Sequence, residues 1–183
     1  MIFEEKKVIL KNGIEAVLKT PETEDAEMLL NCIKTSCGET PFLMRDAEDK
    51  NDMTVEDEAK WIRNKRESEN ELVIACYIGG VVVGSCDITF FNDKKTFHRA
   101  GLGIAITKKY WNIGIGSTMF DILIKIAKEH DSTEILELSF VEGNERGQAL
   151  YEKFGFEIVA KIPDAYKLKD GTYQNKIFMQ RYL

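Results

Sequence analysis

The most constraining feature of this sequence is a run of three adjacent strand-like segments in its middle. Residues 71–78 (ELVIACYI) and 81–91 (VVVGSCDITFF) are rich in β-branched and aromatic residues, and only Gly79-Gly80 separates them. A two-glycine connection favours a tight hairpin turn, because both positions can adopt a positive φ. After the NDKK turn, residues 96–106 (TFHRAGLGIAI) follow as a third strand. The sequence therefore predicts an antiparallel meander.

Helix-like segments flank this meander. Residues 21–39 and 54–68 carry acidic side chains near their starts and apolar residues at helical spacing, and we expect Thr23 and Thr54 to cap them. The remaining patterns predict an early strand and then, after the meander, helix, strand, helix and two strands, at residues 14–20, 114–129, 134–140, 144–154, 156–162 and 175–183. This order predicts a mixed α+β fold in which an antiparallel meander feeds one crossover.

The composition fits a single domain over residues 1–183. The chain is 44% hydrophobic and shows no linker or internal repeat, so we expect one full core. The net charge of -6 disfavours nucleic acid as a partner, because phosphate contacts need clustered Lys and Arg. No apolar run reaches the roughly 18 residues of a membrane span, and the start, MIFEEKKVILKNG, lacks an apolar signal-peptide segment. We therefore expect a cytoplasmic protein with no membrane partner.

Metal binding is not expected from the spacing of the potential ligands. The two histidines are far apart, and no Cys-x-x-Cys pair occurs among the four cysteines, which are Cys32, Cys37, Cys76 and Cys86. Buried, reduced thiols are the plainer interpretation.

The segment Trp111–Gly116 (WNIGIG) stands directly before a long helix with apolar periodicity. A helix N-terminus leaves backbone N–H groups free and carries a partial positive charge, and glycines let a phosphate approach the main chain. A dinucleotide-binding fingerprint would need glycine where Met119 stands, and a P-loop would need Lys after Gly116, where Ser117 stands. Neither motif fits, and a plain connecting loop is the alternative to a phosphate site.

The sequence closely resembles the GNAT superfamily of N-acetyltransferases along nearly its whole length. The resemblance is sharpest in residues 102–127 (LGIAITKKYWNIGIGSTMFDILIKIA) and 141–156 (VEGNERGQALYEKFGF). The family loop reads Arg/Gln-x-x-Gly-x-Gly/Ala, and Trp111 replaces its Arg or Gln. The second block matches the family at Asn144, Ala149, Leu150, Tyr151 and the Gly155-Phe156 pair.

This resemblance implies a mostly antiparallel sheet flanked by helices, in which the strand 96–106 splays away from the strand 134–140. Acetyl-CoA is then the cosubstrate, and its pantetheine arm fills the gap. The resemblance places the cofactor-binding residues on one strand, the glycine loop and the second block: Leu102, Gly103, Ile104, Ala105, Ile106, Trp111, Asn112, Ile113, Gly114, Ile115, Gly116, Ser117, Asn144 and Tyr151.

The implied reaction is direct attack of a primary amine on acetyl-CoA within a ternary complex. An amine has a pKa of about 10.4, so it must lose a proton before it attacks a thioester. The departing thiol, with a pKa of about 8.5, is helped by a proton donor. Tyr151 matches the family tyrosine that has this role, and we expect it to be catalytic. No cysteine falls in either motif, which argues against an acetyl-cysteine.

The general base stays open at this point. Many relatives have Glu at the position of Gly101, and Asp87, His98, Glu137 or a water relay are alternatives. The acceptor is open too: a small-molecule amine leads, and a protein N-terminus or lysine is the alternative. Acidic residues between 46 and 58 would suit a cationic acceptor, or simply form a solvated surface. Because Gly101 replaces the usual acid, an acyl-CoA-binding module without catalysis is a further alternative. We expect a monomer or homodimer.

Overall fold

The computed structural model describes residues 1–43, 53–168 and 170–183. These residues form one eight-stranded sheet with the strand order β1-β2-β3-β4-β5-β6-β8-β7. The strands are β1 (Lys6–Ile9), β2 (Glu15–Lys19), β3 (Glu71–Ile78), β4 (Val81–Phe90), β5 (Arg99–Ile106), β6 (Ile135–Val141), β7 (Glu157–Lys167) and β8 (Tyr173–Tyr182).

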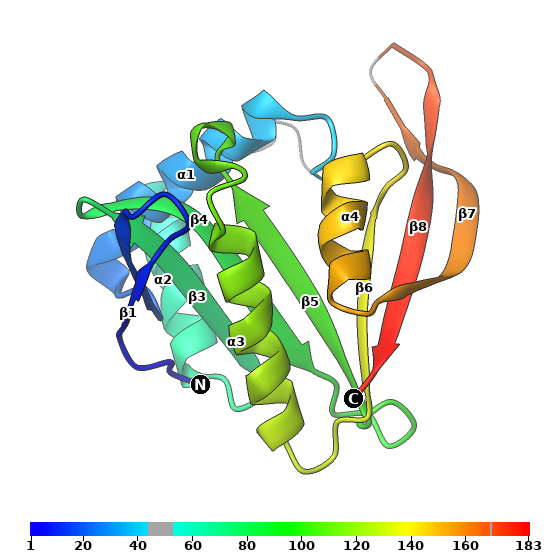
Figure 1. Ribbon diagram of the computed structural model, residues 1–183, viewed down its shortest axis with the longest axis horizontal. Helices are drawn as coiled ribbons and strands as arrows, with labels where there is room; N and C mark the ends of the chain where they lie inside the picture. Colours follow the sequence, from blue (N-terminus) through cyan, green and yellow to red (C-terminus); the bar gives the residue numbers. More distant parts are fainter. Residues whose placement is uncertain (44–52, 169) are drawn as a thin grey trace.

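Helices cover both faces of this sheet (Figure 1). Two lie on one face, α1 (Ala26–Glu39) and α2 (Val55–Glu67), and two lie on the other, α3 (Ile115–Glu129) and α4 (Glu145–Lys153). Short 3-10 turns, η1 (Thr23–Asp25) and η3 (Lys108–Tyr110), precede α1 and α3. The mixed α+β fold predicted from the sequence is confirmed.

The predicted meander is confirmed as β3, β4 and β5, which pair in antiparallel fashion in this order. Helix α3 then crosses over to β6, which pairs with β5 in parallel. The larger core lies between the sheet and α3, whose buried side chains include Ile115, Met119 and Phe120. Met119 is fully buried there, so the residue that breaks the dinucleotide fingerprint serves packing.

Strands β5 and β6 pair at only three positions, from Arg99↔Ile135 to Gly101↔Glu137. Beyond Gly101, β5 continues along β4 to Ile106, while β6 continues along β8 to Val141. The two strands therefore diverge, as Figure 1 shows, and the expected splayed pair is confirmed. This opening is the main feature that the fold provides for a ligand.

Two local predictions have different outcomes. Thr54 caps α2 as expected, because its side chain accepts a hydrogen bond from the N–H of Asp57 and Asp57 reaches back to the N–H of Thr54. The Thr23 prediction is wrong: the reciprocal cap is formed by Glu22 and Asp25, one residue earlier. The acidic residues predicted between 46 and 52 lie outside the described part of the chain.

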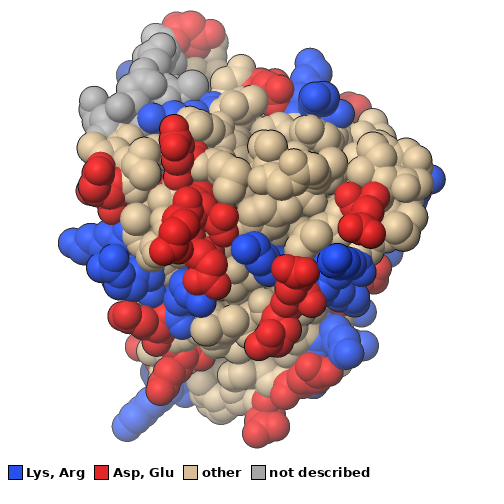
Figure 2. Space-filling view, turned by 90° about the vertical axis from the view of Figure 1, so that its left-hand side faces the viewer, with Lys and Arg blue, Asp and Glu red and all other residues tan. Residues whose placement is uncertain are grey.

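On the face in Figure 2, acidic and basic side chains are interspersed, so this face carries no broad patch of positive charge. Among the described helices, none has both the length and the apolar character that crossing a bilayer requires. Within the same residues, no group of three or more His, Cys, Asp or Glu side chains is arranged to hold a metal ion.

Candidate functional site

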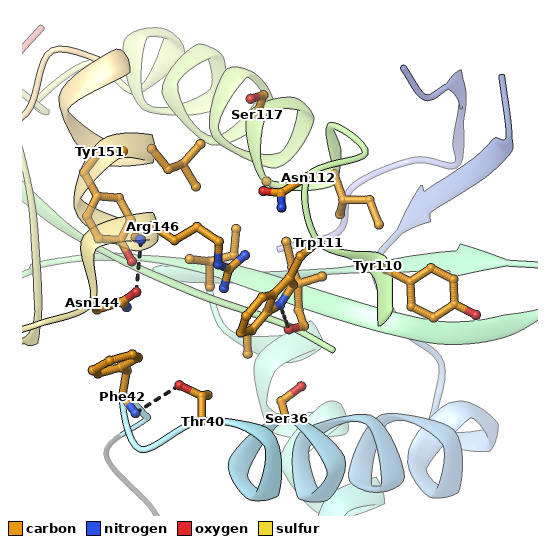
Figure 3. Close-up of a pocket in the computed structure, with 18 of the residues that line it drawn as sticks. Ser36, Thr40, Phe42, Tyr110, Trp111, Asn112, Ser117, Asn144, Arg146 and Tyr151 are labelled. Atoms are coloured by element: carbon orange, nitrogen blue, oxygen red, sulfur yellow. Dashed lines mark hydrogen bonds between the residues drawn. The ribbon is translucent and has the colours of Figure 1, made fainter. Parts of the chain in front are cut away.

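A cavity of about 450 Å³ lies where β5 diverges from β6. Its walls come from the last residues of β5, the loop before α3 with the first turn of that helix, the end of α1 with the residues after it, the length of α4, and Lys11 (Figure 3). Most of the predicted site residues meet there: Ile104, Ala105, Ile106, Trp111, Asn112, Gly114, Ile115, Gly116, Ser117, Asn144 and Tyr151. Leu102, Gly103 and Ile113 do not line it, so the structure does not bring these three into contact with the cavity.

The glycine loop has the backbone geometry that its sequence indicates. Asn112 and Gly114 both have a positive φ, 63° and 103°, and Gly114 is the N-cap of α3. A side chain at position 114 would be strained in this conformation and would lie 3.2 Å from Cγ of Lys11. The carbonyl of Ile113 accepts a hydrogen bond of 3.1 Å from the N–H of Lys11, which ties the loop to the β1–β2 turn.

The start of α3 presents unused hydrogen-bond donors. Thr118 is the first residue whose N–H bonds back into the loop, to the carbonyl of Gly114 at 3.0 Å. The backbone N–H groups of residues 112–117 donate no hydrogen bond to any other described residue. Because free N–H groups at a helix start attract anions, the loop is suited to hold a phosphate.

The charge of the cavity also favours an anion. Three cationic side chains, Lys11, Arg146 and Lys153, line it, and no Asp or Glu of the described residues does so. Lys153 reaches across from α4 and donates a 2.9 Å hydrogen bond to Oγ of Ser117. This positive lining stands out in a chain whose net charge is -6.

Arg146 is a cavity residue that the sequence reasoning missed. Its guanidinium carbon lies 3.3 Å from the centroid of the Trp111 ring, and burial lowers its pKa, although the guanidinium stays charged. Trp111 is held in turn by a 2.6 Å hydrogen bond from Nε1 to the carbonyl of Ile106. The only sequence signal was a basic residue two positions after Asn144 in the matching block.

Tyr151 packs its ring in the core and turns its hydroxyl toward the cavity (Figure 3). The side chain is only 8% exposed, and its ring centroid lies 5.4 Å from that of Phe120 and 5.5 Å from that of Phe140. Burial raises the pKa of the phenol to about 12, and the charge of Arg146 opposes this shift. The hydroxyl is therefore protonated at neutral pH.

Asn144 and Gly116 have packing roles that bear on the site. Oδ1 of Asn144 accepts a 3.0 Å hydrogen bond from the N–H of Gly147 and so caps α4. A Cβ added at Gly116 would lie 3.1 Å from Cδ2 of Leu150 and 3.6 Å from Cδ1 of Ile106. The glycine at 116 thus permits close contact between α3 and α4 as well as access to the main chain.

The three base candidates lie in different surroundings. His98 precedes β5 at the end opposite to the cavity, and its carbonyl bonds the N–H groups of Glu134 and Ile135. Glu137 forms an ion pair with Arg99. Asp87 is half-buried on β4 beside Gly103, and burial raises its pKa.

All four cysteines are buried, and none of them lines the cavity. Burial raises the pKa of Cys32 and of Cys76 to about 12 and that of Cys86 above its ordinary value. These three thiols are therefore protonated and poorly nucleophilic at neutral pH.

Comparisons with known proteins point to one family. The model of the acetyltransferase (GNAT) family matches residues 40–156. An L-amino acid N-acetyltransferase of Escherichia coli (strain K12) is 28% identical over 109 residues, which are 60% of this chain and 66% of that relative's length. This chain therefore spans just under two thirds of that relative.

Solved structures share the fold. An acetyltransferase of the GNAT family from Streptococcus pneumoniae has a TM-score of 0.84 and 25% identity, covering 92% of this chain and 99% of that one. A ribosomal-protein-alanine N-acetyltransferase from Brucella melitensis has a TM-score of 0.78 and 22% identity, with coverages of 91% and 99%. The yncA protein of Salmonella typhimurium, solved with its cofactor acetyl-CoA, has a TM-score of 0.77 and 15% identity, with coverages of 92% and 94%.

Proposed function

This chain belongs to the GNAT acetyltransferase family, and we propose that it transfers the acetyl group of acetyl-CoA to the primary amine of a small molecule. The family assignment supports an N-acetyltransferase activity. The nature of the acceptor and the order of the chemical events are the parts that we add.

The observation that carries the proposal is the chemistry of the cavity at the end of β5 that diverges from β6. A cavity with three cations, no carboxylate from the described residues and unused N–H groups at the start of α3 suits a ligand with several phosphates. Acetyl-CoA is such a ligand. We assign its diphosphate to the N–H groups of residues 112–117 and its pantetheine arm to the edge of β5 that β6 leaves unpaired.

We propose direct attack rather than transfer through the protein. The nitrogen of the neutral amine bonds to the acetyl carbon and loses a proton to a base, the bond between that carbon and sulfur breaks, and Tyr151 donates its phenolic proton to the sulfur. The buried thiols support this route, because none of them lines the cavity and a covalent relay needs an accessible thiolate.

The test is a thiol-release assay with acetyl-CoA and a panel of amines. The panel begins with L-amino acids, because the Escherichia coli relative bears that name, and continues with polyamines and with peptides that carry a free N-terminus or lysine. We expect CoA release that depends on a small amine. Release that depends only on peptides would replace the proposed acceptor, and no release with any amine would refute the proposed activity.

A further inference from the structure

We propose that Asp87 accepts the proton of the acceptor amine, and that β4 delivers this carboxylate across Gly103 into the opening between β5 and β6. The proposal rests on the amine acetylation proposed above and supplies its missing base. It assigns to the neighbouring strand a role that Gly101 cannot fill.

The first support is the fit between Asp87 and Gly103. The two residues are opposite each other in the β4–β5 ladder. A Cβ built at Gly103 would lie 2.4 Å from Oδ1 of Asp87, which is closer than real side chains approach. Because Gly103 has no positive φ, its backbone does not require glycine. The absence of a side chain at position 103 therefore gives the Asp87 carboxylate its place.

The second support is the position of this pair along the opening. Pairing between β5 and β6 ends at Gly101, and Gly103 is the next residue on the same face of β5. Ala105 follows on that face and lines the cavity. Residues on the same face of a strand are about 7 Å apart, so Gly103 and the carboxylate above it are about 7 Å from the cavity residue Ala105. At this point of β5, β6 no longer pairs with it.

The third support is that Asp87 and Tyr151 approach the opening from opposite faces of the sheet. Asp87 lies opposite Val73 and two residues from Ser85, on the face that α1 and α2 cover. Tyr151 belongs to the core on the α3 face. The cavity is lined both by Tyr151 and by residues that follow α1, including Thr40 and Phe42, so its lining comes from the elements on both faces of the sheet. A base and an acid on opposite sides of the reacting bond suit amine attack with thiol departure.

The surroundings leave the carboxylate of Asp87 available. Within residues 1–43, 53–168 and 170–183, no hydrogen bond or ion pair engages it. The charged groups that face it are Lys65 from α2 and Glu71 from β3, and these two form an ion pair with each other. Burial raises the pKa of Asp87, Glu71 adds to this shift and Lys65 opposes it, and a higher pKa makes a carboxylate a better base.

The protons balance in this scheme. As the bond between nitrogen and the acetyl carbon forms, the proton of the amine moves to the Asp87 carboxylate. As the bond between the acetyl carbon and sulfur breaks, the Tyr151 proton moves to sulfur. Asp87 then releases its proton to water and Tyr151 regains one from water, so no further reactant is needed.

The test compares Asp87→Asn with Asp121→Asn, a matched change from carboxylate to amide at an exposed position of α3 outside the cavity. We expect Asp87→Asn to lower kcat about 10²–10⁴-fold while CoA affinity stays unchanged, and Asp121→Asn to retain the activity. In wild type, kcat/KM should rise with pH through the pKa of Asp87. The midpoint of this rise should stay at the same pH when acceptor amines of different ammonium pKa are compared. The rise should be absent in Asp87→Asn.

Two further variants keep the test decisive. Gly103→Ala leaves the carboxylate in the chain but displaces it, and we expect a loss of kcat that is not additive with Asp87→Asn. If Asp87→Asn fails to fold, Asp87→Ser removes the carboxylate without crowding Gly103 and should show the same loss. An active wild type with an equally active Asp87→Asn or Asp87→Ser overturns this inference alone. An inactive wild type refutes the proposed acetylation and this inference together.

Discussion

The guanidinium of Arg146 stacks on the ring of Trp111, with 3.3 Å between the guanidinium carbon and the ring centroid, and so joins α4 to the loop before α3. Trp111 stands where the family pattern has Arg or Gln. Arg146 therefore supplies a cation at this part of the cavity, from α4 rather than from the loop. Stacking on the indole orients the guanidinium without neutralising it.

This contact predicts that Arg146→Ala weakens CoA binding. A hydrogen bond to a charged group contributes about 1.5–3 kcal/mol, so Kd should rise about tenfold to a hundredfold. Arg146→Lys should fall between wild type and Arg146→Ala, because it keeps the charge but not the planar stack. Calorimetric titration with CoA measures these affinities. In a Trp61→Phe background, the fluorescence of Trp111 should change when CoA binds. This change should be smaller when Arg146→Ala is added to the same background. An unchanged Kd in Arg146→Ala would remove Arg146 from the binding site.

Gly116→Ala should weaken CoA binding and also cost some stability. The loss of stability is expected because an added Cβ would lie 3.1 Å from Cδ2 of Leu150, where α3 and α4 are in close contact. Adding Leu150→Val removes that atom and should restore the unfolding temperature but not the affinity. If affinity returns together with stability, the glycine serves helix packing alone.

Tyr151→Phe should lower kcat about 10²–10⁴-fold with little change in unfolding temperature or in CoA affinity, because the ring packing is kept. A general acid works while it is protonated, so activity falls as pH rises through its pKa. Burial raises the pKa of Tyr151 to about 12, so wild-type kcat should show no loss from this group near pH 10, where an ordinary tyrosine ionises. Full kcat in Tyr151→Phe, measured with chemistry rate-limiting, would reduce Tyr151 to a packing residue.

Incubation with acetyl-CoA alone should leave all four cysteines unmodified in intact-protein mass spectrometry. The thiols of Cys32 and Cys76 have a pKa of about 12 and are buried, so the thiolate needed for attack is scarce at neutral pH. A stoichiometric thioester that passes its acetyl group to an added amine would overturn direct transfer.

The elements that the sequence predicted well are those with strong local signals. The meander is marked by β-branched residues and Gly79-Gly80, and α3 by apolar periodicity behind the glycine loop. Strand β1 was missed because it is short and mostly exposed, and pairing with β2 defines it rather than its own residue pattern. The extent of β7, to Lys167, was also missed, since its side chains are almost all exposed and its pairing with β8 sustains it.

The part of the site that could be predicted from the sequence is the part that one continuous segment of the chain supplies. The loop and the end of β5 come together as expected, because one continuous segment supplies them. Lys11 and Arg146 reach the same cavity from the β1–β2 turn and from α4, and no local pattern relates such distant residues. The relationship of Asp87 to Gly103 depends on strand register, which local sequence does not set here.

The most direct test of the account follows an isotopically labelled acetyl group from acetyl-CoA to a small amine, with mass spectrometry of both the amine and the protein. We expect labelled N-acetyl amine in wild type, much less in Tyr151→Phe and Asp87→Asn, and no label on the protein. Tight CoA binding without labelled product from any amine would contradict it, and would indicate an acyl-CoA-binding protein that has lost catalysis.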